Sequence, residues 1–279
     1  MLGFKIFNND PPEVTDALIE IAHRDNLALE IALYGDSIDE FTKVVTSNPN
    51  YVQNNNKSIH FNYKKYVVNN IKEEKYYNNF LNEVQQAKNL LINRGVIHYQ
   101  YAGHPATHLE NFTPEAIKEN LTVLYKAATE QDIIFYIENT FIYRIAYYLN
   151  ELKHHRILWD TILELGFQDR IGICLDWGHV KAFSKESLMI WIDYVKQLKE
   201  KGIPVYMHVH DNDSQKDLHH SLKIGHELQH YLKNHCGDKE YIKILGDIVD
   251  YFKNDSLILE YEASIAKDHY IWTKSEINK

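Results

Sequence analysis

The chain has 279 residues, of which 44% are hydrophobic and 25% charged, a balance typical of a globular protein with a sizeable core. The formal net charge of −9 argues against general affinity for nucleic acid. Two cysteines are too few for a disulfide framework, and no apolar run approaches the roughly 18 residues of a membrane span. Because the start also lacks a signal-peptide pattern, we expect a soluble, cytoplasmic protein with no membrane partner.

Strand-length runs of apolar or β-branched residues recur along the chain. They predict strands at 3–7, 27–33, 58–61, 96–100, 133–137, 171–175, 205–209 and 256–259. Helical periodicity between them predicts helices at 13–23, 75–93, 113–131, 144–165, 184–201 and 239–252. Eight strands alternating with helices favour an α/β fold in which parallel strands close into a (β/α)8 TIM barrel. We expect a single domain over residues 1–279.

A doubly wound open sheet is the alternative architecture. Such sheets usually carry a glycine-rich phosphate loop after the first strand. Here the first predicted strand is followed by Asn8-Asn-Asp-Pro-Pro12, which contains no glycine. The barrel is therefore the favoured fold.

Histidine and acidic residues gather where the predicted strands end. The carboxyl ends of parallel barrel strands meet at one face, where barrel active sites lie. Six consecutive strands, from the third to the eighth, deliver His, Asp or Glu to this face: His60, His98, Glu138, Asp176, His179, His210, Glu260, and Asp217 and His219 in the loop after the seventh strand. Imidazole and carboxylate ligands together suit Zn, Mn, Fe or Co, and so many carboxylates without a cation would repel one another. The pattern predicts an enzyme with a divalent metal cofactor.

Spacing within the motifs refines this prediction. Asp176 and His179 are three residues apart across Gly178, so a chain turning out of a strand can aim both at one ion. His208 and His210 point the same way along their strand, and we interpret His208 as a residue beneath His210 that either supports the metal ligands or packs against them. Seven further histidines fall in loops or helices and are interpreted as surface residues: His104, His108, His154, His155, His226, His230 and His235.

The pattern resembles the xylose isomerase-like barrel superfamily, which contains sugar isomerases and epimerases together with endonuclease IV of AP endonuclease family 2. Its most specific pieces are Ile137-Glu-Asn139, Cys174-Leu-Asp-Trp-Gly-His179, His208-Val-His-Asp-Asn-Asp213 with Asp217-Leu-His219, and Leu259-Glu260. The resemblance to sugar-isomerising members implies one metal bound by Glu138, Asp176, His210 and Glu260, with the two glutamates also acting as acid and base. The resemblance to endonuclease IV implies that all nine residues hold three metals.

Three more residues are candidates for substrate contact: Tyr63, which also fits the endonuclease IV pattern, Trp177 and His208. The gap from His210 to Asp217 is shorter than in endonuclease IV. The segment His210-Asp-Asn-Asp213 resembles the His-Asp-Asn-Asp motif of proteins grouped with sugar-phosphate isomerases. The stretch 34–40 is acidic, whereas a loop that inserts into DNA would carry basic and planar side chains. Lys223-Ile-Gly-His226 also replaces the Gly-Glu-Gly run that is common after the Asp-x-His pair.

We therefore expect a divalent-metal-dependent isomerase or epimerase of a small sugar or sugar phosphate, with one to three ions and proton transfer by Glu138 and Glu260. Two alternatives stay open. One is an endonuclease IV-like multi-zinc phosphodiester hydrolase, for which nucleic acid would be the partner. The other is a multinuclear iron oxidase. The sequence also leaves open whether the chain forms a homo-oligomer.

Overall fold

Eight parallel strands close into a barrel, as the sequence predicts. The computed structural model describes residues 1–34, 38–100, 113–139, 152–183, 187–210, 238–261 and 263–277. The strands follow one another in chain order around the barrel, and β1 pairs with both β2 and β8. Their bounds are β1 Leu2–Phe7, β2 Ala28–Ala32, β3 Lys57–His60, β4 Arg94–His98, β5 Ile134–Glu138, β6 Ile171–Asp176, β7 Val205–Val209 and β8 Ser256–Leu259.

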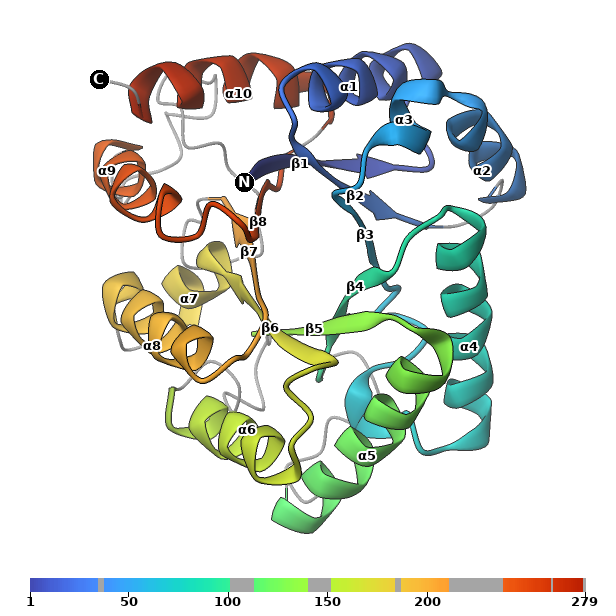
Figure 1. Cartoon of the computed structure of the whole chain (residues 1–279), viewed down its shortest axis with the longest axis vertical. Helices are drawn as coiled ribbons and strands as arrows, with labels where there is room; N and C mark the ends of the chain where they lie inside the picture. The colour runs from blue at the N-terminus through green and yellow to red at the C-terminus, as the bar shows by residue number, and fades with distance from the viewer. Residues whose placement is uncertain are drawn as a thin grey trace.

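Helices surround the strands on the outside of the barrel (Figure 1). Those in the described ranges are α1 Pro12–Arg24, α2 Ile38–Ser47, α3 Pro49–Gln53, η1 Val68–Asn70, α4 Glu74–Asn89, α5 Pro114–Gln131, α6 Leu152–Leu165, α7 Trp177–Phe183, α8 Leu188–Glu200, α9 Asp238–Val249 and α10 Ala263–Ile277. Helix α4 ends four residues before the predicted 93, because Leu91 adopts a left-handed backbone with φ 59° that a helix cannot continue. Among the described residues, no helix combines the length and apolar character needed to cross a membrane.

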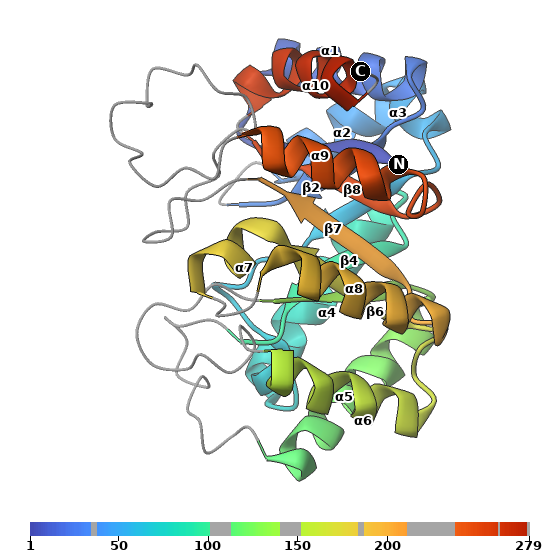
Figure 2. The same cartoon turned by 90° about the vertical axis from the view of Figure 1, so that its left-hand side faces the viewer.

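The two ends of the chain meet where the barrel closes. Helices α1 and α10 lie side by side in both views (Figure 1 and Figure 2), and their residues are in contact. The amino group of Met1 donates a hydrogen bond to the carbonyl of Asp255 over 2.6 Å. These contacts supplement the pairing of β1 with β8 that completes the sheet.

The side chains inside the barrel form layers, and these layers position the site. Six strands each give one residue to a small apolar cluster inside the barrel: Ala28, Val96, Tyr136, Cys174, Tyr206 and Ile258. A residue two positions further along a strand points to the same face. Those positions hold Glu30, His98, Glu138, Asp176, His208 and Glu260. Strand alternation therefore stacks a polar layer directly above the apolar one, toward the carboxyl ends of the strands.

Candidate metal centre

Seven of the nine predicted metal ligands converge in the described structure, and each is no more than 6% exposed: His60, His98, Glu138, Asp176, His179, His210 and Glu260. The other two, Asp217 and His219, lie outside the described residues. The seven come from β3, β4, β5, β6, the start of α7 and the residues that follow β7 and β8. Their role as metal ligands stays a prediction.

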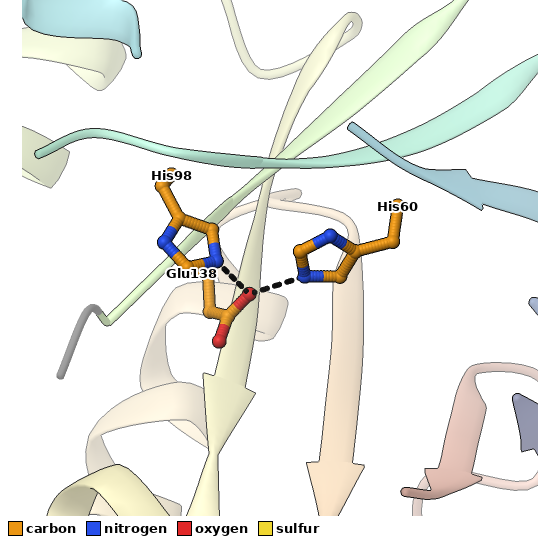
Figure 3. A group of neighbouring side chains, drawn as sticks. All are labelled: His60, His98 and Glu138. Atoms are coloured by element: carbon orange, nitrogen blue, oxygen red, sulfur yellow. Dashed lines mark hydrogen bonds and ion pairs between the residues drawn. The ribbon is translucent and has the colours of Figure 1, made fainter. Parts of the chain in front are cut away.

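One group lies at the ends of three neighbouring strands (Figure 3). Nε2 of His60 is 3.2 Å from Oε2 of Glu138, and Nε2 of His98 is 3.1 Å from the same oxygen. Pairing of β4 with β5 sets His98 directly opposite Glu138. Half-buried Tyr63 stacks on the ring of His98 with a centroid distance of 4.5 Å, so it borders this group, and its predicted substrate contact stays untested.

A second group forms where β6 turns into α7. Nε2 of His210 lies 3.1 Å from each carboxylate oxygen of Asp176. Oδ1 of Asp176 also accepts a hydrogen bond of 2.7 Å from the backbone N–H of His179, so the carboxylate caps the first turn of α7. Nδ1 of His179 lies 3.2 Å from Oε1 of Glu138. Glu138 therefore links the two groups.

Asn139 holds Asp176 in place. Its side-chain amide accepts from the backbone N–H of Asp176 at 2.6 Å and donates to the carbonyl of Asp176 at 2.9 Å. The backbone carbonyl of Asn139 accepts from Nδ1 of His179 at 2.7 Å. One residue thus fixes the backbone of Asp176 and the ring of His179. Metal-binding histidines commonly donate their second ring N–H to a carbonyl in this way.

A charged network lies beside these groups inside the barrel. Nε2 of His208 is 3.0 Å from Oε2 of Glu30, and its Nδ1 is 3.2 Å from Oε2 of Glu260. Nζ of Lys5 lies 3.4 Å from Oε1 of Glu30 and donates a hydrogen bond to Oε1 of Glu260. His208 therefore does more than pack beneath His210, since its two ring nitrogens join the buried carboxylates of Glu30 and Glu260.

Neighbouring imidazoles favour the charged forms of Asp176 and Glu138. Burial by itself raises the pKa of Asp176, but His179 and His210 lower it to about 2. Burial likewise opposes ionisation of Glu138, and His98 and His208 hold its pKa well below the ordinary value. Burial lowers the pKa of His208, yet the surrounding acidic groups, with Cys174 and Glu260 foremost, raise it well above the ordinary value.

Comparison with known protein families identifies the fold family. The family model described as xylose isomerase-like TIM barrel matches residues 17–273, which is most of the chain. The chain belongs to this family. A comparison with curated protein sequences gives no significant match.

Solved xylose isomerase-like barrels share the overall architecture. A D-tagatose 3-epimerase-like protein aligns with a TM-score of 0.66 at 18% identity, covering 99% of this chain and 98% of that one. The TTHB071 protein from Thermus thermophilus, soaked with ZnCl2, gives 0.63 at 16% identity over 99% and 97%. The 3-keto-D-glucoside 4-epimerase YcjR from E. coli gives 0.63 at 12% identity over 98% of both chains. At these identities the likeness shows the fold alone.

The donor set of this xylose isomerase-like barrel fits a divalent cation. Nδ1 of His208 lies within 3.7 Å of carboxylate oxygens of Glu138 and Asp176 and within 3.2 Å of Glu260. Ligand atoms of Asp176, His179 and His210 lie within 4.8 Å of one another, as do those of Asp176, His208 and Glu260. Three carboxylates this close need a positive charge among them. The raised pKa of His208 favours its charged form there, the Lys5 ammonium lies against Glu260, and a bound ion would supply further positive charge.

Some residues were missed or misassigned by sequence reasoning. Lys5 and Glu30 are absent from the predicted site, although both stand out as charged residues within otherwise apolar strands. Asn139 belongs to the Ile137-Glu-Asn139 motif but has no role in the prediction. Trp177 is fully buried in the apolar core, and its predicted substrate contact stays untested. His155 was interpreted as a surface residue, which is wrong: it is 0% exposed and accepts a hydrogen bond from Nε1 of Trp159 at 3.2 Å.

Proposed function

We propose that this chain is a divalent-metal-dependent isomerase or epimerase of a small sugar or sugar phosphate. The observation that carries the proposal is the placement of two glutamates around one point. Glu138 at the end of β5 and Glu260 after β8 both approach Nδ1 of His208, at 3.7 and 3.2 Å, beside Asp176 and His210. The two carboxylates thus come from different parts of the barrel and approach the same imidazole nitrogen.

This arrangement suits proton transfer at carbon. Glu138, Asp176, His210 and Glu260 would hold the metal, which when bound would stabilise negative charge developing on a substrate oxygen. One glutamate would remove the proton from the carbon next to a carbonyl. The other would return a proton to the neighbouring carbon for isomerisation, or to the opposite face of the same carbon for epimerisation. No net oxidation or added reactant is required. Membership of the xylose isomerase-like family and the epimerase-named solved structures support this chemistry.

Hydrogen exchange with solvent tests the proposal directly. Metal-loaded protein would be incubated in D2O with ketoses, aldoses and their phosphates, and deuterium at the carbon beside the carbonyl would be followed by NMR. We expect exchange and product formation for at least one substrate, and loss of both in Glu138→Gln and Glu260→Gln. A metal-loaded protein that exchanges no hydrogen into any sugar would contradict the proposal.

A second candidate, phosphoester hydrolysis by a multi-metal cluster, is favoured by the group of His60, His98 and Glu138. Nδ1 of His60 donates to the carbonyl of Phe61 at 3.1 Å, so the lone pair of a neutral His60 lies on Nε2 and faces the carboxylate. Burial, followed by nearby Lys5, lowers the pKa of His60 and favours this neutral form. A lone pair 3.2 Å from an ionised carboxylate oxygen is repelled by it, so a cation bound by both atoms would stabilise the pair. A second ion there would suit hydrolysis, in which neighbouring metals share the attacking and leaving oxygens.

Cleavage of a duplex containing an abasic site, assayed at moderate salt, tests this second candidate. Binding that neutralises phosphates should weaken steeply as salt is raised, because counterions are released. Strand cleavage without hydrogen exchange into any sugar would favour the hydrolase over the isomerase. Neither activity in a protein that holds several metals would leave the iron oxidase or another hydrolase.

A further inference from the structure

Lys5 is an ammonium group sealed inside the barrel. Its side chain is 2% exposed, and it lies between Glu30, whose side chain is 0% exposed, and Glu260, whose side chain is 6% exposed. Strand pairing sets Lys5 directly beside Glu30, whereas Glu260 follows β8 on the other side of β1. A buried ammonium is stable only where carboxylates and hydrogen bonds compensate for its lost hydration. Both partners of Lys5 are such carboxylates.

The two oxygens of Glu260 have different surroundings. Oε1 accepts the hydrogen bond from Lys5. Oε2 lies 3.2 Å from Nδ1 of His208 and 4.0 Å from Nε2 of His210, on the side where Asp176 and His210 meet. The side chain therefore has one oxygen tied to the barrel interior and the other directed to the candidate metal centre.

We propose that Lys5 is a positioning residue that holds Oε1 of Glu260, so that Glu260 offers only Oε2 to a metal ion. The inference rests on the proposed metal centre, and it assigns a role to a residue outside the ligand set. Glu30 supports this arrangement, because its carboxylate contacts the Lys5 ammonium from the other side. Its own second oxygen bonds to His208, so Glu30 is anchored as well. Such supporting groups orient metal ligands and tune the ion.

Removal of the Lys5 ammonium should release Oε1 of Glu260 and change how Glu260 coordinates a metal. In Lys5→Met, both oxygens of Glu260 become available to one ion. The positive charge beside the centre also disappears, which favours cation binding. Titration of metal-free protein with Co2+, followed by visible absorption, reports both affinity and coordination. We expect the Co2+ band to weaken in Lys5→Met, as is typical of a higher coordination number, with affinity equal to or tighter than that of wild type.

A charge-balanced variant guards against failure of the single variant to fold. Lys5→Met takes a cationic partner from two buried carboxylates, Glu30 and Glu260, and breaking a buried pair is strongly destabilising, by about 3–5 kcal/mol. Lys5→Met/Glu30→Gln removes one charge of each sign, and the new amide oxygen at position 30 can still accept from His208. We expect the same weakened Co2+ band. Lys57→Met is the matched control, because Lys57 is also a buried strand lysine but donates its hydrogen bonds, within the described chain, to the carbonyls of Tyr51 and Val52. It should keep the wild-type band.

The outcomes separate this inference from the proposed function. Wild-type protein that binds no Co2+ would overturn both. Normal Co2+ binding with an unchanged band in the Lys5 variants would overturn the positioning role alone. The same band change in Lys57→Met would also overturn it, because the effect would then follow from loss of any buried ammonium.

Discussion

The ring of His210 lies directly against Gly178. A Cβ atom at position 178 would come within 2.0 Å of Cε1 of His210 and within 2.6 Å of its Nε2, which is far inside van der Waals contact. Gly178 is the second residue of α7, whose first turn is capped by Asp176. The absence of a side chain there lets His210 reach both oxygens of Asp176.

Gly178→Ala should therefore displace His210 and weaken metal retention. Misplacement of a ligand by its supporting shell typically reduces metal affinity about 10- to 100-fold. Overpacking should also destabilise the fold by about 1–3 kcal/mol. Metal equivalents after dialysis and the urea unfolding curve measure the two effects. Gly246→Ala, where a Cβ meets nothing within 4 Å, is the control and should bind metal normally. Wild-type metal content in Gly178→Ala would contradict the expectation.

Asp176→Ala and His210→Ala should abolish metal retention while leaving the fold largely intact. Both side chains lie at the carboxyl face of the barrel, where removal seldom disturbs core packing. Elemental analysis gives metal content, and circular dichroism reports the fold. Asp193→Ala on α8, whose side chain is 61% exposed, should retain metal. Full metal content in both site variants would refute the site assignment.

Most of the barrel and of the site followed from two periodic rules. Alternation along a strand fixes which residues share a face, and parallel barrels gather strand ends at one rim. These rules were enough to bring His98, Glu138 and Asp176 together. They do not give the height of one strand relative to another across the barrel.

That missing height explains why Lys5 and Glu30 were overlooked. The sequence places Lys5 on the face opposite Phe4 and Ile6, but its contact with Glu260 depends on closure between the first and last strands. His155 was misassigned for a related reason. A polar residue on an amphipathic helix is usually exposed, whereas here α8 covers it, with the ring of Trp191 4.7 Å from the His155 ring.

Glu30 should make the metal-free protein lose stability in acid. Burial alone raises its pKa, but His208 and Lys5 lower it from 4.5 to about 2. Because the folded pKa lies below the unfolded one, the stabilisation is present above about pH 4.5 and is lost as the pH falls toward 2. The difference corresponds to about 3 kcal/mol.

Urea unfolding at a series of pH values measures this contribution. Glu30→Gln should be less stable at pH 7 and should lose less stability than wild type between pH 4.5 and 2. Glu119→Gln, with an exposed side chain, should follow the wild-type curve. Parallel pH curves for Glu30→Gln and wild type would show that Glu30 does not carry the effect.

The number of bound metals should decide the reaction class. Proton transfer needs one ion beside a carboxylate base, so His60 and His98 would then be spectators or sugar-binding groups. Hydrolysis gains from neighbouring ions, so both histidines would be ligands, with Asp217 and His219. The proposed isomerase predicts one tightly held metal per chain, and His60→Ala or His98→Ala should leave that count unchanged. Metal counting by elemental analysis, with Asp176→Ala as the variant that loses the ion, makes the comparison. Two or three metals in wild type, with one lost in His60→Ala, would overturn the one-metal isomerase in favour of the multi-metal hydrolase if abasic-site duplex is cleaved.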